Sequence, residues 1–502
     1  MNHIIPQVAR FSLSMTDELP GLEQGWIGQT KMDLYDYQWR SFRASLPLLL
    51  SFAIIVIAFV RIARNQSYQT LVGTNIVVGI LFLYALHGYW TIYIYMIIYM
   101  NYEVCRLAAR NLSRNKGSVI IWCFNLCMMV YVPLYGSRLY VPKFLQPFGY
   151  EGMQGWTSMF HMLILKFISF GMDYVWAVHS APDQSMTEHH LDYKTRQNTN
   201  QPMDRYTFSN FLAYSTYVPL FIGGPIISFN AFVSQLDIPQ TTYSSRGLIF
   251  YGIFRLALIF LIMDVFLHFW YPNALTASQS ESILSQIQPC SLAFGVSLLT
   301  LLFMWLKFLL IWRTSRFWSL LCGIETPENM NRCVLNNYSM IQFWRDWHSS
   351  FNIWLLRYIY IPLGGSKSVS RRSKYFNVFV VFFFVAVWHD PEWRYIHWAW
   401  IVLLAIVPES LCRTIFYETK FGSKIRKYRF FSNFLVIFGG TLNVFLMMSA
   451  NLVGYVYGLN GLSILTQTLT SSPLIDIFMT FGGLYMGVAV MYMIEQNREK
   501  NI

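Results

Sequence analysis

Long apolar runs alternate with short polar segments along most of this chain. Several runs reach the roughly 18–20 residues that an α-helix needs to cross the hydrocarbon core of a bilayer. The pattern predicts membrane-spanning helices at about 46–62, 71–100, 118–135, 155–178, 207–229, 247–270, 291–312, 375–389, 395–411, 433–457 and 473–493. The run at 71–100 is long enough for one tilted span or two short ones. We therefore expect an all-α polytopic membrane protein of roughly 10–12 tilted transmembrane helices.

Composition supports this class of protein. The chain is 55% hydrophobic and only 12% charged, whereas soluble domains carry about 25% charged residues. The net charge of +12 comes from basic residues in short loops between apolar runs, such as 61–64, 106–116 and 420–429. This is the positive-inside pattern, which predicts a luminal N-terminus and a cytosolic loop at 61–70 rather than binding to nucleic acid.

The polar segments predict five regions. We expect a luminal or interfacial amphipathic segment at 1–45, transmembrane helices at 46–178, a polar loop at 179–205, a core holding the candidate chemistry at 206–411, and further transmembrane helices at 412–502. Glu188, His189 and His190 lie in the polar loop, but adjacent histidines lack ligand geometry, so no metal site is predicted.

His389 ends the apolar run that begins at Val378, which predicts a titratable side chain at membrane depth. Such residues are expensive in a bilayer and are functional candidates by default. Imidazole also suits general base catalysis near neutral pH. The alternative is a structural histidine that caps a helix end before Asp390 and Pro391.

A second histidine, His348, lies in the amphipathic segment 341–365. Pro362, Gly364 and Gly365 are expected to end a helix in this segment. Irregular backbone at membrane depth survives only where it is buried in protein or lines a cavity. We therefore expect a re-entrant helix and turn beside an internal cavity, with an ordinary interfacial histidine as the alternative for His348.

The residue types favour a reaction that uses a single base. The chain has no G-x-S-x-G motif, and its seven cysteines show no paired or zinc-like spacing. His389 would take the proton of an acceptor hydroxyl, which then attacks a thioester, while His348 orients the acceptor. Five buried charged residues are expected to pair with one another: Lys166, Asp173, Arg255, Asp264 and Lys307.

Neighbouring residues suggest how substrates are held. Arg and Lys bind phosphate, so a basic cluster after the glycine pair is a candidate for the phosphates of coenzyme A, with a topology signal as the alternative. The members of this cluster are Lys367, Arg371, Arg372 and Lys374. The candidate substrate-binding residues are Trp344, Arg345, Trp347, Asn352, Trp388 and Asp390.

These motifs together resemble the core of the membrane-bound O-acyltransferase superfamily. The resemblance rests on Phe343–His348, Arg357–Gly365, the ending Trp388-His389 and the earlier Tyr217–Phe229, and it covers about residues 205–410. It implies many tilted helices around a central tunnel, with acyl-CoA as the co-substrate entering from the cytosol. It also implies that His389 is the catalytic histidine and His348 the second polar position of the active site.

Within the superfamily, Asp33–Trp39 resembles a stretch of the hedgehog acyltransferases. Those proteins have an aspartate where this chain has His348, and this variant is most similar to the fungal glycerol uptake proteins. That likeness implies addition of a long acyl chain to a lyso-lipid of glycosylphosphatidylinositol (GPI) anchors in the endoplasmic reticulum membrane. Cys333, fifteen residues before His348, occupies the place of a haem-ligating cysteine in the hedgehog branch.

Three other functions remain open from the sequence: a glycerol transporter or uptake regulator, a protein palmitoyltransferase of the hedgehog type, and a catalytically inactive scaffold. Transport needs polar groups spaced along a path, whereas esterification needs one base beside an acyl tunnel. The unusual polar residues gather between 341 and 390, which favours the acyltransferase.

Overall fold

The computed structural model describes residues 4–146, 149–180, 192–277, 287, 290–365, 371–458 and 460–500. Within these ranges nine segments are helical, long and apolar enough to cross a membrane, and a shorter apolar helix covers Ser373–His389. Strand structure in the described residues is limited to one antiparallel pair, in which Glu23 faces Met32. The expectation of an all-α polytopic protein is confirmed.

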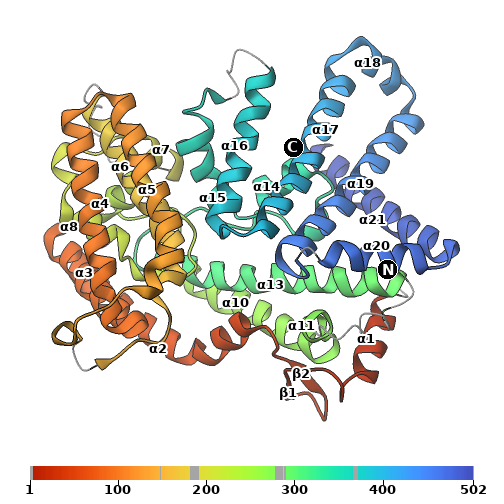
Figure 1. Ribbon diagram of the computed structural model, residues 1–502, viewed down its shortest axis with the longest axis horizontal. Coiled ribbons are helices and arrows are strands. Elements are labelled where there is room, and N and C mark those ends of the chain that lie inside the picture. The colour runs from red at the N-terminus through yellow and green to blue at the C-terminus, as the bar shows by residue number, and fades with distance from the viewer. Residues whose placement is uncertain are drawn as a thin grey trace.

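The first helices form a bundle that is drawn from red to yellow in Figure 1. Its members are α2 (Tyr37–Arg64), α3 (Tyr68–His87), α4 (Thr91–Asn111), α5 (Arg114–Tyr135) and α6 (Phe160–Val178). The apolar run at 71–100 is divided because Gly88 has a left-handed φ of 56°. A side chain at Gly88 would also collide with the backbone at Tyr150, so α3 ends there and α4 begins after a short turn.

The expected span at 207–229 is wrong. Instead, α8 (Phe208–Ser215) ends early, a 3-10 turn covers Val218–Leu220, and α9 begins at Phe229 and ends at Asp237. Pro219 and the sequence Gly223-Gly224-Pro225 interrupt the run, because proline lacks the backbone donor that a continuous helix needs. Both short helices are packed inside the protein, where their apolar residues are core.

The N-terminal segment contains α1 (Ile4–Ser14), β1 (Leu22–Gln24) and β2 (Lys31–Asp33), and it packs against α10 (Ser245–Phe269), α11 (Pro272–Ala277) and α13 (Cys290–Leu321). The Asp33 carboxylate accepts hydrogen bonds from the backbone nitrogens of Asn273 (2.8 Å) and Ala274 (3.2 Å). Trp39 is fully buried. The stretch Asp33–Trp39 is thus anchored to the protein by buried Asp33, Leu34 and Trp39, whereas Tyr35, Tyr37 and Gln38 are exposed.

The candidate chemistry lies on short central elements between two groups of long helices (Figure 1). These central elements are α14 (Met340–Asp346), α15 (Ser349–Leu355), a π-helical turn at Leu356–Tyr360, and α16 (Arg371–His389). The C-terminal group comprises α17 (Trp393–Glu418), α18 (Lys420–Lys427), α19 (Arg429–Tyr455), α20 (Asn460–Ser471) and α21 (Leu474–Lys500). The small helix α7 (Tyr193–Asn198) packs on α9.

Four of the five charged residues are buried and have partners other than one another, whereas Arg255 is exposed. Asp173 binds Arg357 at 2.9 Å, Asp264 binds Arg43 at 3.2 Å, and Lys307 binds Asp36 at 2.8 Å. Lys166 instead donates to the backbone carbonyls of Tyr214 and Ser215. The partners in these three ion pairs lie 184, 221 and 271 residues apart in the sequence. The sequence pattern therefore could not identify them.

Candidate active site

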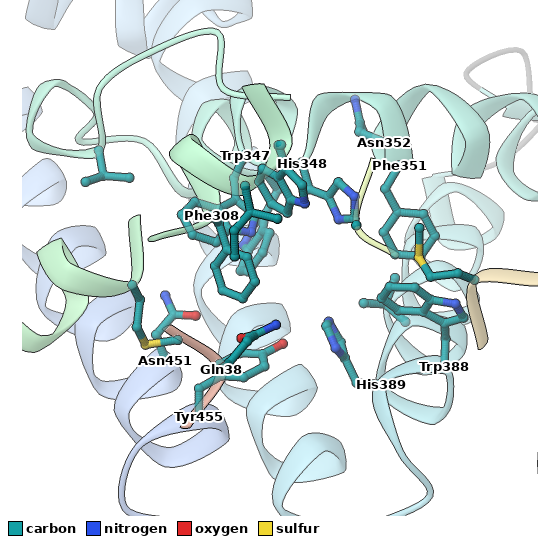
Figure 2. Close-up of a pocket in the computed structure, with 18 of the residues that line it drawn as sticks. Gln38, Phe308, Trp347, His348, Phe351, Asn352, Trp388, His389, Asn451 and Tyr455 are labelled. Carbon is teal, nitrogen blue, oxygen red and sulfur yellow. The ribbon is translucent and has the colours of Figure 1, made fainter. Parts of the chain in front are cut away.

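A central cavity of about 1410 Å³ is lined by side chains from α2, α3, α13 to α17, α19 and α21. Its volume exceeds the 300–1,000 Å³ typical of pockets for one small molecule. Both His348 and His389 line it, and Figure 2 shows their rings facing the same open space from different walls. The fold therefore brings together the two histidines that the sequence singled out.

His389 is held at the end of α16 by aromatic contacts. Its ring stacks on Tyr395 at 5.6 Å between centroids and meets the edges of Tyr455 (5.3 Å) and Trp398 (6.1 Å). No residue in the described part of the chain hydrogen-bonds its ring nitrogens, whereas the ring borders the cavity. This arrangement fixes the plane of the imidazole and leaves its nitrogens available to a substrate.

His348 has an unusual backbone. Its φ of 48° and ψ of 47° are left-handed, and it is the only non-glycine residue with positive φ in the described ranges. The turn between α14 and α15 is held by the loop around Asn329, whose side-chain oxygen accepts from the Ser350 nitrogen at 3.1 Å and whose backbone oxygen accepts from the Ser349 nitrogen at 3.1 Å. Left-handed backbone at a non-glycine residue persists where its surroundings determine it, commonly at functional sites.

The His348 ring stacks on Trp312 of α13, with centroids 4.5 Å apart and planes 18° apart. Its Nε2 is buried and has no protein partner. A buried polar nitrogen without a partner is costly, so a substrate group is the natural partner for this side of the imidazole.

Trp388 lies beside both histidines. Its ring centroid lies 4.8 Å from that of His389 and 6.4 Å from that of His348. The indole nitrogen donates to the backbone oxygen of His161 at 2.9 Å, and the ring packs on Phe351 at 4.5 Å. Trp388 is therefore an anchored part of the cavity wall next to both imidazoles.

Most predicted substrate-binding residues border this cavity. The lining includes Trp344, Arg345, Trp347, Asn352 and Trp388. Asp390 was placed wrongly, because it lies beyond the end of α16 and does not line the cavity. One residue past a helix end suffices to turn a side chain away from the face that its neighbour presents.

The structure describes only part of the basic cluster. Lys374 is exposed and lines the cavity. Arg371 and Arg372 begin α16, but their side chains lie outside the described residues, as does Lys367 altogether. The Glu188-His189-His190 sequence also lies outside them.

Cys333 does not fit an enclosed haem site. Its thiol is exposed and does not line the cavity, although Val334 and Leu335 beside it do. The adjacent Arg332 forms ion pairs with Glu495 at 2.6 Å and with Asp346 at 3.7 Å.

The sequence argument missed several cavity residues from distant elements. They include Gln38 of α2, Trp312 of α13, and Asn451 and Tyr455 of α19 (Figure 2). The glycine at position 454 marks one of these contacts in the sequence, because a side chain there would lie 2.9 Å from the Trp398 ring. Glycine thus allows α19 to approach α17 closely and brings Tyr455 against His389.

Charge is unevenly distributed around the cavity. Among the described lining residues, Arg345 and Lys374 are the only lysine or arginine, and no carboxylate is present. The rest is mainly aromatic and aliphatic. Such a site excludes water, offers cations to an anionic group, and presents imidazoles to a neutral reacting centre.

Comparison with known proteins agrees with this geometry. Residues 148–449 match the model of the MBOAT, membrane-bound O-acyltransferase, family. The membrane-bound O-acyltransferase gup1 of Schizosaccharomyces pombe is 31% identical over 95% of this chain and 83% of its own length. GUP1 of Candida tropicalis is 32% identical over 95% and 81%, respectively. The protein-cysteine N-palmitoyltransferase HHAT of Mus musculus is 29% identical over 41% of this chain and 40% of its own length.

The family match covers more than half of the chain, and the GUP1 relatives match nearly all of it. Members of the family use acyl-CoA as the donor. This chain belongs to the membrane-bound O-acyltransferase family and is an O-acyltransferase of its GUP1 branch, related to hedgehog acyltransferase.

Proposed function

We propose that this enzyme transfers a long fatty acyl chain from acyl-CoA to a hydroxyl of a lyso-lipid, and that it remodels GPI anchors in the endoplasmic reticulum membrane. The observation that carries the proposal is the His389 imidazole, which borders a large apolar cavity and has no hydrogen-bond partner in the described chain. That is the position and the chemistry of a general base.

In the reaction, a His389 nitrogen accepts the proton of the acceptor hydroxyl. The oxygen then attacks the carbonyl carbon of the thioester, forming the new C–O bond. The C–S bond breaks, and the coenzyme A thiolate leaves and takes a proton from the imidazolium. One ester and one free thiol result, so no redox partner is required.

His348 is suited to orient the acceptor rather than to exchange its proton. Its ring is fixed by stacking on Trp312, and its backbone is locked in the left-handed region. A rigid hydrogen-bonding group beside the reacting centre lowers the entropic cost of alignment. We assign His348 a positioning role.

The choice of a lyso-lipid is supported by the nearly full-length match to GUP1 proteins. The mouse palmitoyltransferase acts on a protein cysteine according to its name, and it matches only 41% of this chain. His348 also stands where the hedgehog branch has an aspartate. These differences favour a lipid hydroxyl over a protein amine or thiol as the acceptor.

The test is His389→Ala, compared with wild type and with His397→Ala, a histidine of α17 outside the cavity lining. We expect acyl transfer to a lyso-lipid to fall about 10²–10⁴-fold for His389→Ala, with expression and membrane insertion retained. His397→Ala should keep wild-type activity. Cells carrying only His389→Ala should also lack long-chain GPI anchors, as measured by lipid mass spectrometry. Normal anchors in those cells would refute the proposal.

A further inference from the structure

The cavity-facing side of α2 changes from polar to apolar along the helix. Gln38, Ser41 and Ser45 line the cavity at spacings of three and four residues, which places them on one helical face. Leu49 and Phe52 continue this face. One wall of the active-site cavity therefore carries three neutral polar side chains followed by hydrocarbon.

The three polar side chains are free for a ligand. No hydrogen bond joins the side chain of Gln38, Ser41 or Ser45 to another described residue, although each borders the cavity. By contrast, Ser51 on the outer side of α2 bonds the Pro47 carbonyl at 2.9 Å. A helix that spans a membrane gains nothing from unpaired hydroxyls, which need a partner when water is excluded.

The start of α2 is held rigidly. The Asp36 carboxylate caps the helix by accepting from the Trp39 nitrogen at 2.7 Å, and it also binds Lys307 at 2.8 Å. Arg43 pairs with Asp264, which also accepts from the Trp26 indole at 3.1 Å. Asp36 and Arg43 are thus paired with charges of other helices, and the side chains of α2 that line the cavity are all neutral.

Positively charged side chains line another part of the same cavity. Arg345 and Lys374 supply its positive charge, which suits the phosphates of coenzyme A. The α2 face offers amide and hydroxyl groups, which suit neutral oxygen atoms such as those of a glycerol backbone. The two substrates therefore have chemically distinct walls.

The apolar end of the face opens outward. Leu48 of α2 and Leu81 of α3 both line the cavity and are 67% and 63% exposed at the protein surface. Both helices are candidate membrane spans. A hydrocarbon tail bound at this end of the face would extend from the cavity into the bilayer.

We infer that this face of α2 is the acceptor subsite: Gln38, Ser41 and Ser45 bind the neutral oxygen-rich backbone around the reacting hydroxyl, and Leu48, Leu49 and Phe52 bind the lipid tail. The inference rests on the proposed lyso-lipid acyltransferase activity and specifies its acceptor as an amphiphile. Figure 2 shows Gln38 at the edge of the same opening as His389 and Tyr455.

The experiment compares two acceptors with the purified full-length enzyme and palmitoyl-CoA. One acceptor is 1-palmitoyl lysophosphatidylinositol, and the other is 1-hexadecanol, which has the tail and one hydroxyl but no glycerol backbone. The variants are Gln38→Ala and Ser41→Ala with Ser45→Ala. The matched controls are Gln24→Ala and Ser51→Ala, because both residues are exposed and lie outside the cavity lining.

We expect KM for the lyso-lipid to rise about 5- to 10-fold in each test variant, as loss of neutral hydrogen bonds predicts. KM for acyl-CoA, the slow hydrolysis of acyl-CoA by water, and transfer to hexadecanol should stay within about twofold of wild type, since none of these uses the lost hydrogen bonds. Both controls should match wild type for both acceptors.

Two results would overturn the inference in different ways. If wild type acylates the lyso-lipid and the variants are unchanged, or lose hexadecanol transfer and hydrolysis in parallel, the subsite is wrong while the proposed function stands. If wild type acylates neither acceptor, the proposed function fails and the subsite with it.

Discussion

At the residue scale, the distinctive feature is a histidine in the left-handed region of backbone space. His348 is the residue where α14 stops and α15 starts. Its carbonyl accepts from the Phe351 nitrogen at 2.8 Å and from the Asn352 nitrogen at 3.1 Å. The conformation sends the chain around a sharp corner and aims the imidazole at the cavity. A straight helix through this point would separate it from His389.

This geometry predicts different outcomes for two substitutions of His348. Asparagine tolerates the left-handed region, whereas a β-branched residue does not. We expect His348→Asn to keep wild-type thermal stability and to lose about tenfold in kcat/KM, the effect of one hydrogen bond. His348→Val should lower stability by about 1–3 kcal/mol as well. Thermal unfolding in detergent together with acyl-transfer kinetics would measure both; equal stability of the two variants would contradict this account of the corner.

At the scale of elements, α16 connects the two ends of the chemistry. Its last residue is His389, and Lys374 lies near its start. Both residues line the cavity. Because a helix rises 1.5 Å per residue, the fifteen positions between them correspond to about 22 Å, long enough for the pantetheine arm of coenzyme A. We therefore expect α16 to set the distance between the phosphates of bound coenzyme A and the reacting centre.

This arrangement of α16 predicts that Lys374→Gln impairs the binding of acyl-CoA selectively. KM for acyl-CoA should rise several-fold, with KM for the lyso-lipid unchanged, because Lys374 contributes charge at the donor end. Raising the ionic strength should shrink the difference from wild type, since an exposed cation is screened by salt. Lys420→Gln on the exposed start of α18 is the matched control. Equal KM values for acyl-CoA in both variants would show that Lys374 is a topology signal only.

At the scale of the whole molecule, long helices lie on either side of the central elements (Figure 1), and members of both groups line the cavity with apolar side chains. One wall comes from α2 and α3 and a second from α17, α19 and α21, and α13 packs against α2, α19 and α21. The second wall includes Ile406, Val444, Met447 and Met448. If the acceptor tail lies along α2, the donor's acyl chain is left with the C-terminal wall.

That division predicts where chain length is selected. Met448 is 7% exposed and lines the cavity, whereas Met479 is 69% exposed and does not. Met448→Trp should shorten the longest acyl chain that is transferred, because the packed wall cannot accommodate the larger side chain, which therefore occupies cavity space. Met479→Trp should keep the wild-type range. Competition among acyl-CoAs of graded length, with products measured by mass spectrometry, would decide; a shift in acceptor tail preference instead would assign this wall to the acceptor.

Much of this protein follows from sequence alone because its physical basis is local. Hydrophobic runs specify membrane spans, since backbone groups in lipid must bond within their own helix. The irregular segment at 341–365 was identified by its single proline, its glycines and its polar residues, and it borders the cavity. His348 and His389 stood out because titratable groups are rare in such surroundings.

Only the tertiary structure decided which distant residues meet. Gln38, Trp312 and Tyr455 reach the cavity from three helices, and the pattern within one helix does not determine which other helices it meets there. The partners of Asp173, Asp264 and Lys307 were equally hidden, because ion pairing depends on distances in space rather than on separation along the chain. Periodicity specifies that a helix forms; packing against its neighbours determines which of its faces becomes part of the active site.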